Sequence, residues 1–172
     1  MGDVGARFER LIDIMRLLRA PDGCPWDREQ THASLRPFVL EETYEVLEAI
    51  DSGDPAQLRE ELGDFLFEAV FLARLSEEAG DFSIGDAIDA VCAKLIRRHP
   101  HVFDRPADDD GTRLTSAEVV EKWETIKARE REAHERRRVD ELLGKISQGG
   151  MQSLTGKERR FLEKTSKRWS GD

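Results

Sequence analysis

The spacing of apolar residues constrains the fold of this 172-residue chain more than any other feature. Apolar side chains recur three and four residues apart, with polar residues between them, as in Phe8, Leu11, Ile12, Met15 and Leu18. This is the period of an amphipathic α-helix, whereas a half-buried strand alternates at every second residue. No segment of the chain alternates in that way. The sequence therefore predicts an all-α fold of the helical bundle type.

Breakers and capping residues mark where the helices begin and end. Two prolines and a glycine place a loop over residues 20–31, and a second loop, rich in Asp and Pro, covers 99–113. Asp54 can cap a helix with Pro55 at its first position, and Thr115 with Glu118 forms a capping box. The predicted helices cover about 8–18, 35–50, 55–78 and 84–98, with a long and very polar one from 116 onward.

The last part of the chain has a different pattern. A short apolar-patterned helix over 139–146 ends at Gln148-Gly-Gly, and a second capping box, Thr155 with Glu158, opens a final helix through Trp169. We expect a small helical hairpin joined to the rest by a charged stalk. The predicted domains are therefore 1–132, the bundle, and 133–172, the stalk and the tail.

The net charge of −9 is unevenly distributed along the chain. Residues 1–110 contain 25 Asp and Glu against 12 Lys and Arg, whereas residues 111–172 contain 11 against 15. A nucleic-acid-binding protein needs a basic face, so we expect no nucleic acid partner. An acidic surplus indicates either a solvated surface or a cation site, and the positions of the acids decide between the two.

The compartment is predicted from features that the sequence lacks. Two cysteines, Cys24 and Cys92, cannot build a disulfide framework, and their number fits a reducing cytoplasm. The N-terminus has neither the basic start nor the apolar run of a signal peptide. No stretch is long and apolar enough to span a bilayer. We expect a cytoplasmic protein without a membrane partner.

Four acids follow a pattern on two neighbouring predicted helices. Glu42 and Glu45 are three residues apart on one helix, and Glu61 and Asp64 are three apart on the next. Residues three apart share a helix face. Helices joined by a short turn tend to be antiparallel, so the two acidic faces can meet. The neighbours of these acids, such as Phe38 and Phe65, indicate that they lie at the edge of the apolar stripe.

Half-buried carboxylates that meet repel one another unless a cation lies between them. No Lys or Arg falls on either face at this level of the predicted helices. Oxygen ligands suit Mg²⁺, or Mn²⁺, and Mg²⁺ often bridges carboxylates to the phosphates of a substrate. From the spacing alone, a solvated acidic face is an equally good interpretation.

In this chain, Glu41-Glu42-x-x-Glu45 is followed after a gap by Glu61-x-x-Asp64. This pattern resembles the metal-binding motif of the MazG family of nucleoside triphosphate pyrophosphohydrolases. Further segments resemble MazG segments in the order of the family, and the resemblance covers about residues 8–132. These segments are Gly23-Cys-Pro-Trp-Asp27, Leu40-Glu-Glu-Thr-Tyr-Glu-Val46, Arg97-Arg-His-Pro-His-Val-Phe103 and Trp123-Glu-Thr-Ile-Lys127.

The resemblance implies a fold of the all-α NTP pyrophosphatase type and cleavage between the α- and β-phosphates, which gives a nucleoside monophosphate and pyrophosphate. It assigns metal binding to Glu42, Glu45, Glu61 and Asp64, and makes Glu41 the best candidate to activate the attacking water. It also implies a homodimer or higher homo-oligomer. Phosphate contacts are implied for Lys94, Arg98 and Lys127, and a place at the nucleotide for Trp123.

Each of these roles has a plainer alternative. Glu41 could be a surface acid, and Trp123 could pack in the core. Lys94 and Arg98 would also be favourable as cations near the C-terminus of a helix. Trp26, in the proline-rich loop, could stack on a base or anchor the loop, and the sequence favours neither interpretation.

Alternatives also stay open for the function. The chain could clean the nucleotide pool broadly, or act narrowly on dUTP, dCTP or a damaged nucleotide. It could instead be a regulatory module that binds nucleotides without turnover, or a structural bundle without a ligand. The intact set of acids argues against the regulatory module, because a degenerate site would be expected to lose at least one ligand.

Overall fold

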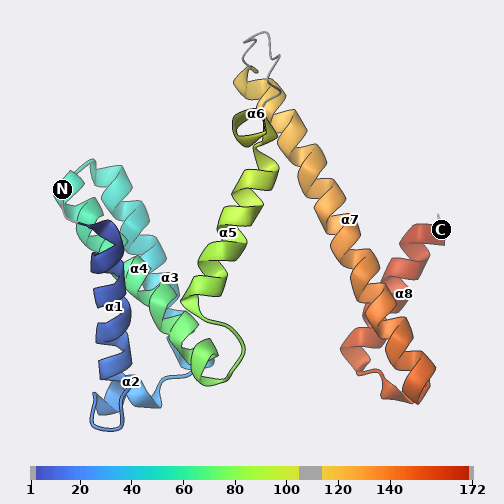
Figure 1. Ribbon diagram of the computed structural model, residues 1–172, viewed down its shortest axis with the longest axis horizontal. Helices are drawn as coiled ribbons and strands as arrows, with labels where there is room; N and C mark the ends of the chain where they lie inside the picture. The colour runs from blue at the N-terminus through green and yellow to red at the C-terminus, as the bar shows by residue number, and fades with distance from the viewer. Residues whose placement is uncertain (1–2, 105–113, 171–172) are drawn as a thin grey trace. The chain divides into compact units, whose positions relative to one another are not determined.

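The computed structural model describes residues 3–104 and 114–170 of the chain. All regular secondary structure within these residues is helical, which confirms the predicted all-α class (Figure 1). The chain divides into two compact units, Met1–Ala93 and Lys94–Asp172, each with its own packing. None of the helices in the described ranges is long and apolar enough to cross a membrane.

The first unit contains α1 (Val4–Leu18), α2 (Pro25–Glu29), α3 (His32–Ser52), α4 (Pro55–Glu78) and the start of α5 (Ile84–Arg98). The long helices α3 and α4 pack against each other, and α1 packs on α4 (Figure 1). Gly53 adopts a φ of 69° where α3 ends, and Asp54 accepts a hydrogen bond from the Ala56 N–H to cap α4. This short turn reverses the chain, so that α3 and α4 are antiparallel.

The core of the first unit joins α1, α3 and α4. Its buried residues are Met15, Leu35, Val70, Phe71 and Leu75, and the predicted stripe of α1, with Phe8, Leu11 and Ile12, packs against them. Burying each large apolar side chain contributes about 1.5–3 kcal/mol. This core supplies the apolar contacts that hold the three helices together.

Polar contacts fix the C-terminal end of α4. The Arg19 guanidinium lies 2.7 Å from a Glu78 carboxylate oxygen and also donates to the backbone carbonyl of Asp27. Hydrogen bonding from Arg19 lowers the pKa of Glu78. The His32 Nε2 lies 3.0 Å from the Ser76 Oγ. These contacts hold the end of α1, the loop after it and the start of α3 against one helix.

Two of the predicted loops contain short helices. Pro25 begins α2 inside the predicted loop over 20–31, because its fixed φ suits the first position of a helix. Pro100 begins α6 (Pro100–Phe103) in the same way within the predicted loop over 99–113. The rest of that loop, 105–113, lies outside the described residues.

The second unit also contains α7 (Ser116–Gly149), the 3₁₀ turn η1 (Met151–Ser153) and α8 (Gly156–Ser170). The predicted capping box of Thr115 and Glu118 opens α7. The separate short helix expected over 139–146 is wrong, because α7 continues through the charged stretch. Glu and Arg are good helix formers, and pairs such as Arg136–Glu132 support the helix. The predicted domain boundary after residue 132 falls within α7 and stays a prediction.

The predicted C-terminal hairpin is present. α8 packs on α7, and Val139, Leu142, Leu154 and Thr165 are buried in the second unit. Glu158 of α8 joins the two helices of the hairpin, because it accepts a hydrogen bond of 2.8 Å from the Lys145 Nζ of α7. It also accepts one of 2.7 Å from the Thr155 N–H, just before α8. The bond from Lys145, followed by those from Thr155, lowers the pKa of Glu158 to about 2.

Candidate metal and nucleotide site

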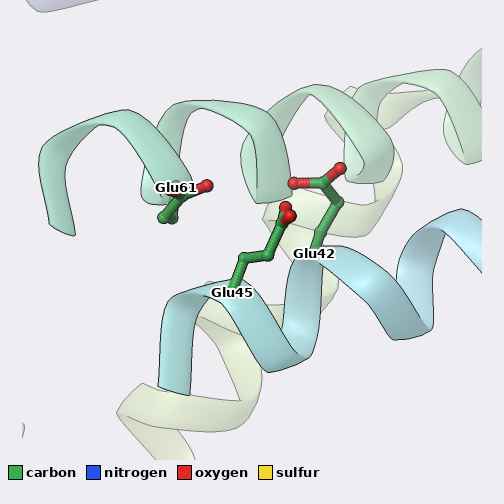
Figure 2. Close-up of side chains that lie close together, drawn as sticks. All are labelled: Glu42, Glu45 and Glu61. Carbon is green, nitrogen blue, oxygen red and sulfur yellow. The ribbon is translucent and has the colours of Figure 1, made fainter. Parts of the chain in front are cut away.

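Three of the predicted metal ligands meet between α3 and α4. Glu42 and Glu45 extend from α3 toward α4, and Glu61 comes from α4 (Figure 2). One carboxylate oxygen from each of the three lies within 4.8 Å of the other two. The arrangement follows from the sequence, because the three-residue spacing sets Glu42 and Glu45 on one face and the short turn at Gly53 brings Glu61 opposite them.

The fourth predicted ligand, Asp64, is exposed on the next turn of α4 and is not among the three acids that meet. It is close enough to act on them, because its negative charge helps to raise the pKa of both Glu42 and Glu61. Its place as a ligand stays a prediction.

Burial and mutual repulsion disfavour the charged form of these acids. Burial is the largest cause that raises the pKa of Glu42, followed by the charges of Glu45 and Asp64. The pKa of Glu61 is raised by burial and then by Glu45. Among the ion pairs of the described residues, none joins Lys, Arg or His to any of the four predicted ligands. The cluster is therefore a site of uncompensated negative charge.

The donor set fits a divalent cation. The Glu42 Oε2 is buried and has no hydrogen-bond partner in the described part of the chain. Burying a carboxylate oxygen without a partner is costly. Carboxylate oxygens from two helices are the ligands that Mg²⁺ and Mn²⁺ prefer. A cation bound by Glu42, Glu45 and Glu61 would both relieve the repulsion and satisfy this oxygen.

Two further candidates lie in the first unit. Glu41 is exposed, and its position lies about 100° around α3 from that of Glu42, because neighbouring positions on a helix differ by this angle. The Trp26 ring meets the Phe38 ring edge to face, with centroids 5.5 Å apart, and 50% of Trp26 is exposed. This contact supports the anchoring of the loop, while the exposed half leaves stacking on a base as a prediction.

The predicted phosphate-binding residues belong to the second unit. The Arg98 Nε and Nη2 donate to Glu130 Oε2 at 2.8 and 2.6 Å, and Arg97 holds the other oxygen of the same carboxylate. Hydrogen bonding from Arg98 is the main cause that lowers the pKa of Glu130. Lys94 is exposed, and no hydrogen bond or ion pair is found for it in the described ranges.

Trp123 and Lys127 form a pair one turn apart on α7. The Lys127 Nζ lies 4.8 Å from the centroid of the Trp123 ring, a cation–π contact, and 2.8 Å from a Glu124 oxygen. Trp123 is 37% exposed, so it is not a core residue of the second unit. The pair presents an aromatic surface and a positive charge together, which are the groups that a nucleotide needs.

One acid near the cluster was missed in the sequence analysis. Glu68 is 7% exposed and its Oε2 has no hydrogen-bond partner among the described residues. The available signal was its position, four residues after Asp64 and seven after Glu61, inside the apolar run from Phe65 to Phe71. A polar residue at this position shares the face of the predicted ligands.

Residues 30–103 match the model of a protein family described as the MazG nucleotide pyrophosphohydrolase domain. This span includes all four predicted metal ligands. This part of the chain is a MazG domain. A second model, of a family of unknown function called DUF6576, matches residues 126–168, which cover the last two thirds of α7, the turn η1 and most of α8.

Proteins named nucleoside triphosphate pyrophosphohydrolase resemble the chain closely. The Thermotoga maritima protein, also named MazG, is 45% identical over 142 residues, which cover 83% of this chain and 52% of that protein. The Escherichia coli K12 protein is 50% identical over 126 residues, covering 73% of this chain and 46% of that protein. The chain thus spans about half the length of these MazG relatives.

The fold is also that of a solved MazG-related protein. A crystal structure of such a protein from Thermotoga maritima aligns with a TM-score of 0.56 at 28% sequence identity. The alignment covers 70% of this chain and 98% of the other. The helical arrangement of the MazG domain therefore follows a known architecture.

Mg²⁺ should raise the melting temperature of the wild-type chain, and Glu42→Gln or Asp64→Asn should abolish most of the rise. At a concentration about 100 times Kd, a cation contributes about 2.7 kcal/mol, or a rise of about 5–10 °C for a chain of this size. In chelator, both variants should melt at or above the wild type, because one repelling charge is gone. Thermal melting followed by circular dichroism measures both effects.

The matched control is Glu29→Gln, an exposed acid of α2 outside the cluster, whose response to Mg²⁺ should equal that of the wild type. An undiminished Mg²⁺ response in both site variants would contradict the assignment of these ligands.

Proposed function

We propose that this chain is a Mg²⁺-dependent nucleoside triphosphate pyrophosphohydrolase that cleaves between the α- and β-phosphates. Its products are a nucleoside monophosphate and pyrophosphate, its role is the cleansing of the nucleotide pool, and Mn²⁺ can replace Mg²⁺. The observation that carries the proposal is the cluster of Glu42, Glu45 and Glu61, whose oxygens lie within 4.8 Å of one another inside a MazG domain.

The names of the relatives support the same reaction. The Thermotoga maritima, Escherichia coli and Mycobacterium tuberculosis proteins are each named nucleoside triphosphate pyrophosphohydrolase, at 45%, 50% and 41% identity. All of them are longer than the part that this chain matches. The reaction is therefore carried over to this chain as a proposal, together with its substrate class.

Each side chain has a part in this reaction. Glu42, Glu45, Glu61 and Asp64 hold the cation, and a bound Mg²⁺ supplies charge neutralisation at the triphosphate. Glu41 holds the attacking water and accepts its proton. The Glu41 side chain is exposed, so solvent water can reach its carboxylate.

The basic residues bind the phosphates. Arg98 uses Nε and Nη2 to hold Glu130, and the structure gives its Nη1 no hydrogen bond within the described residues. Glu130 therefore fixes the guanidinium and leaves donors for a phosphate oxygen. Lys94 and Lys127 add point charges. Trp123, and Trp26 from its loop, provide surfaces on which the nucleoside can stack.

Incubation of the chain with Mg²⁺ and a mixed panel of nucleoside triphosphates should release monophosphate and pyrophosphate in equal amounts. Chromatography of the nucleotides, with separate assays for pyrophosphate and orthophosphate, measures the products, and a chelator should abolish the reaction. Release of a diphosphate and orthophosphate would overturn the proposal. A preference of about 100-fold for one base or sugar would identify a narrow enzyme rather than a broad one.

Lys127→Ala should raise KM about tenfold and leave kcat within about twofold of the wild type. A phosphate contact made equally in the ground and transition states contributes to KM alone, and a tenfold change corresponds to about 1.4 kcal/mol. Lys122→Ala, which removes an exposed lysine from the same helix, is the control and should change neither constant. Unchanged kinetics for Lys127→Ala would show that Lys127 is a solvated surface residue.

We further propose that the chain forms a homodimer or a higher homo-oligomer. Leu40, Tyr44 and Leu47 on α3 are 50–59% exposed, and Leu62 on α4 is 50% exposed. None of the residues of α5 is buried. A monomer rarely exposes apolar side chains at successive helical turns, and a second copy of the chain offers the same apolar face for mutual burial.

Light scattering of the purified chain should give the mass of two chains or a multiple of it. Leu47→Glu, which places a charge within this apolar face, should lower the mass to that of one chain. A wild-type mass of one chain at micromolar concentration would contradict the oligomer.

A further inference from the structure

Glu68 is a buried acid that the roles described above do not use. It lies on α4 between Phe67 and Ala69, is 7% exposed, and has no hydrogen bond or ion pair in the described part of the chain. Charged residues are almost never this buried unless they are paired. Burial accordingly raises the pKa of Glu68. The side chain therefore lacks the partner that a carboxyl group at such a position requires.

The position of Glu68 relates it to the cation site. Asp64 and Glu68 are three and seven residues beyond Glu61, so they lie within about 60° and about 20° of it around α4. The face they share is the one that meets α3. The negative charge of Glu68 is also among the causes that raise the pKa of Glu42, after burial and the charges of Glu45 and Asp64. Glu68 thus continues the row of acids toward the core.

Two buried oxygens on facing helices lack a partner. They are the Oε2 atoms of Glu42 and Glu68, which are the buried side-chain nitrogen and oxygen atoms without a hydrogen bond in the described ranges. Both belong to carboxylates, and neither oxygen accepts a hydrogen bond from the residues that the structure describes. A bound cation, which accepts electron pairs from oxygen ligands, would give both oxygens a partner at once.

The basic residues at the neighbouring end of the first unit have other partners. Arg19 binds Glu78, Arg74 binds Glu77 and Glu78, and the His32 ring bonds to Ser76. The side chains around this part of α4, such as Phe71, are apolar and offer no donor. The described residues of the chain therefore supply no counter-charge for Glu68.

We propose that Glu68 is a fifth carboxylate of the cation site, which binds the cation at its buried end beside Glu42, directly or through a cation-bound water. The proposal rests on the cation site of the proposed function and does not depend on which bond of the substrate is cleaved. Glu68 is a positioning residue, because it acts on the cation and on Glu42 and not on the substrate. Glu61 lies at the other end of the same row, and the exposed acid Asp64 lies between them.

The test is a titration of the full chain with Mn²⁺, in which free Mn²⁺ is followed by electron paramagnetic resonance without a nucleotide. Glu68→Gln keeps the shape of the side chain and removes its charge. It should weaken Mn²⁺ binding about tenfold, since a group that orients or supports a ligand typically contributes 10–100-fold to metal affinity. In chelator, the variant should melt at or above the wild-type temperature, because an unpaired buried acid has been removed.

Glu60→Gln is the matched control. It removes the same charge from the same helix next to Glu61, but Glu60 is exposed and off the shared face. It should change the Mn²⁺ affinity by less than twofold. An equal loss in Glu60→Gln and Glu68→Gln would mean that long-range charge explains the effect, and the proposal would be overturned.

Glu42→Gln separates this proposal from the proposed function. If Glu42→Gln weakens Mn²⁺ binding and Glu68→Gln leaves it within twofold of the wild type, Glu68 is not part of the site. If neither variant changes the affinity, the cation site itself is wrong. Should Glu68→Gln fail to fold, Glu68→Met, of similar length and suited to apolar neighbours, is expected to melt normally and to show the same tenfold loss.

Discussion

The repulsion between carboxylates on α3 and α4 is the interaction on which the rest of the first unit depends. Glu42, Glu45 and Glu61 approach within 4.8 Å, and the described residues provide no basic partner for them. Such a cluster pushes the two helices apart when all its members are ionised. The pKa of Glu42 is raised first by its burial and then by the charges of Glu45 and Asp64. The two helices must therefore be held together by contacts elsewhere, and a bound cation would turn the repulsion into attraction.

Those contacts lie at the two ends of the acidic cluster. At one end, the tight turn at Gly53, with the Asp54 cap, joins the helices covalently over a short distance. At the other end, Phe71 and Met15 are fully buried, and Arg19 forms an ion pair with Glu78. The cluster is thus placed between two firmly fixed regions. A cation that bound there would meet acids already held in position, and little of its binding energy would be lost in ordering them.

Much of this could be predicted from the sequence, because helical spacing and capping are local signals. The three-residue spacing of Glu42 and Glu45 and the Asp54–Pro55 start of α4 determine which faces meet. Glu68 was missed because one acid in an apolar run has the same local pattern as a solvated residue, and its burial depends on how α1 and α3 cover α4. The continuity of α7 was also missed. Its charged stretch lacks an apolar stripe, but side-chain pairs along one helix keep it helical without core contacts.

The continuity of α7 has a consequence for how the nucleotide-binding candidates are held. Trp123 and Lys127 lie near its start, and the hairpin that begins near Val139 is built on the same helix. An isolated helix of this polarity would fray, since most helical stability in proteins comes from packing of an apolar face. The packing of α8, with Glu158 bonded to Lys145, stabilises the far end of α7, while Arg97 and Arg98 hold Glu130 in its first half. Because helix formation is cooperative, fixing both regions also orders the turns between them.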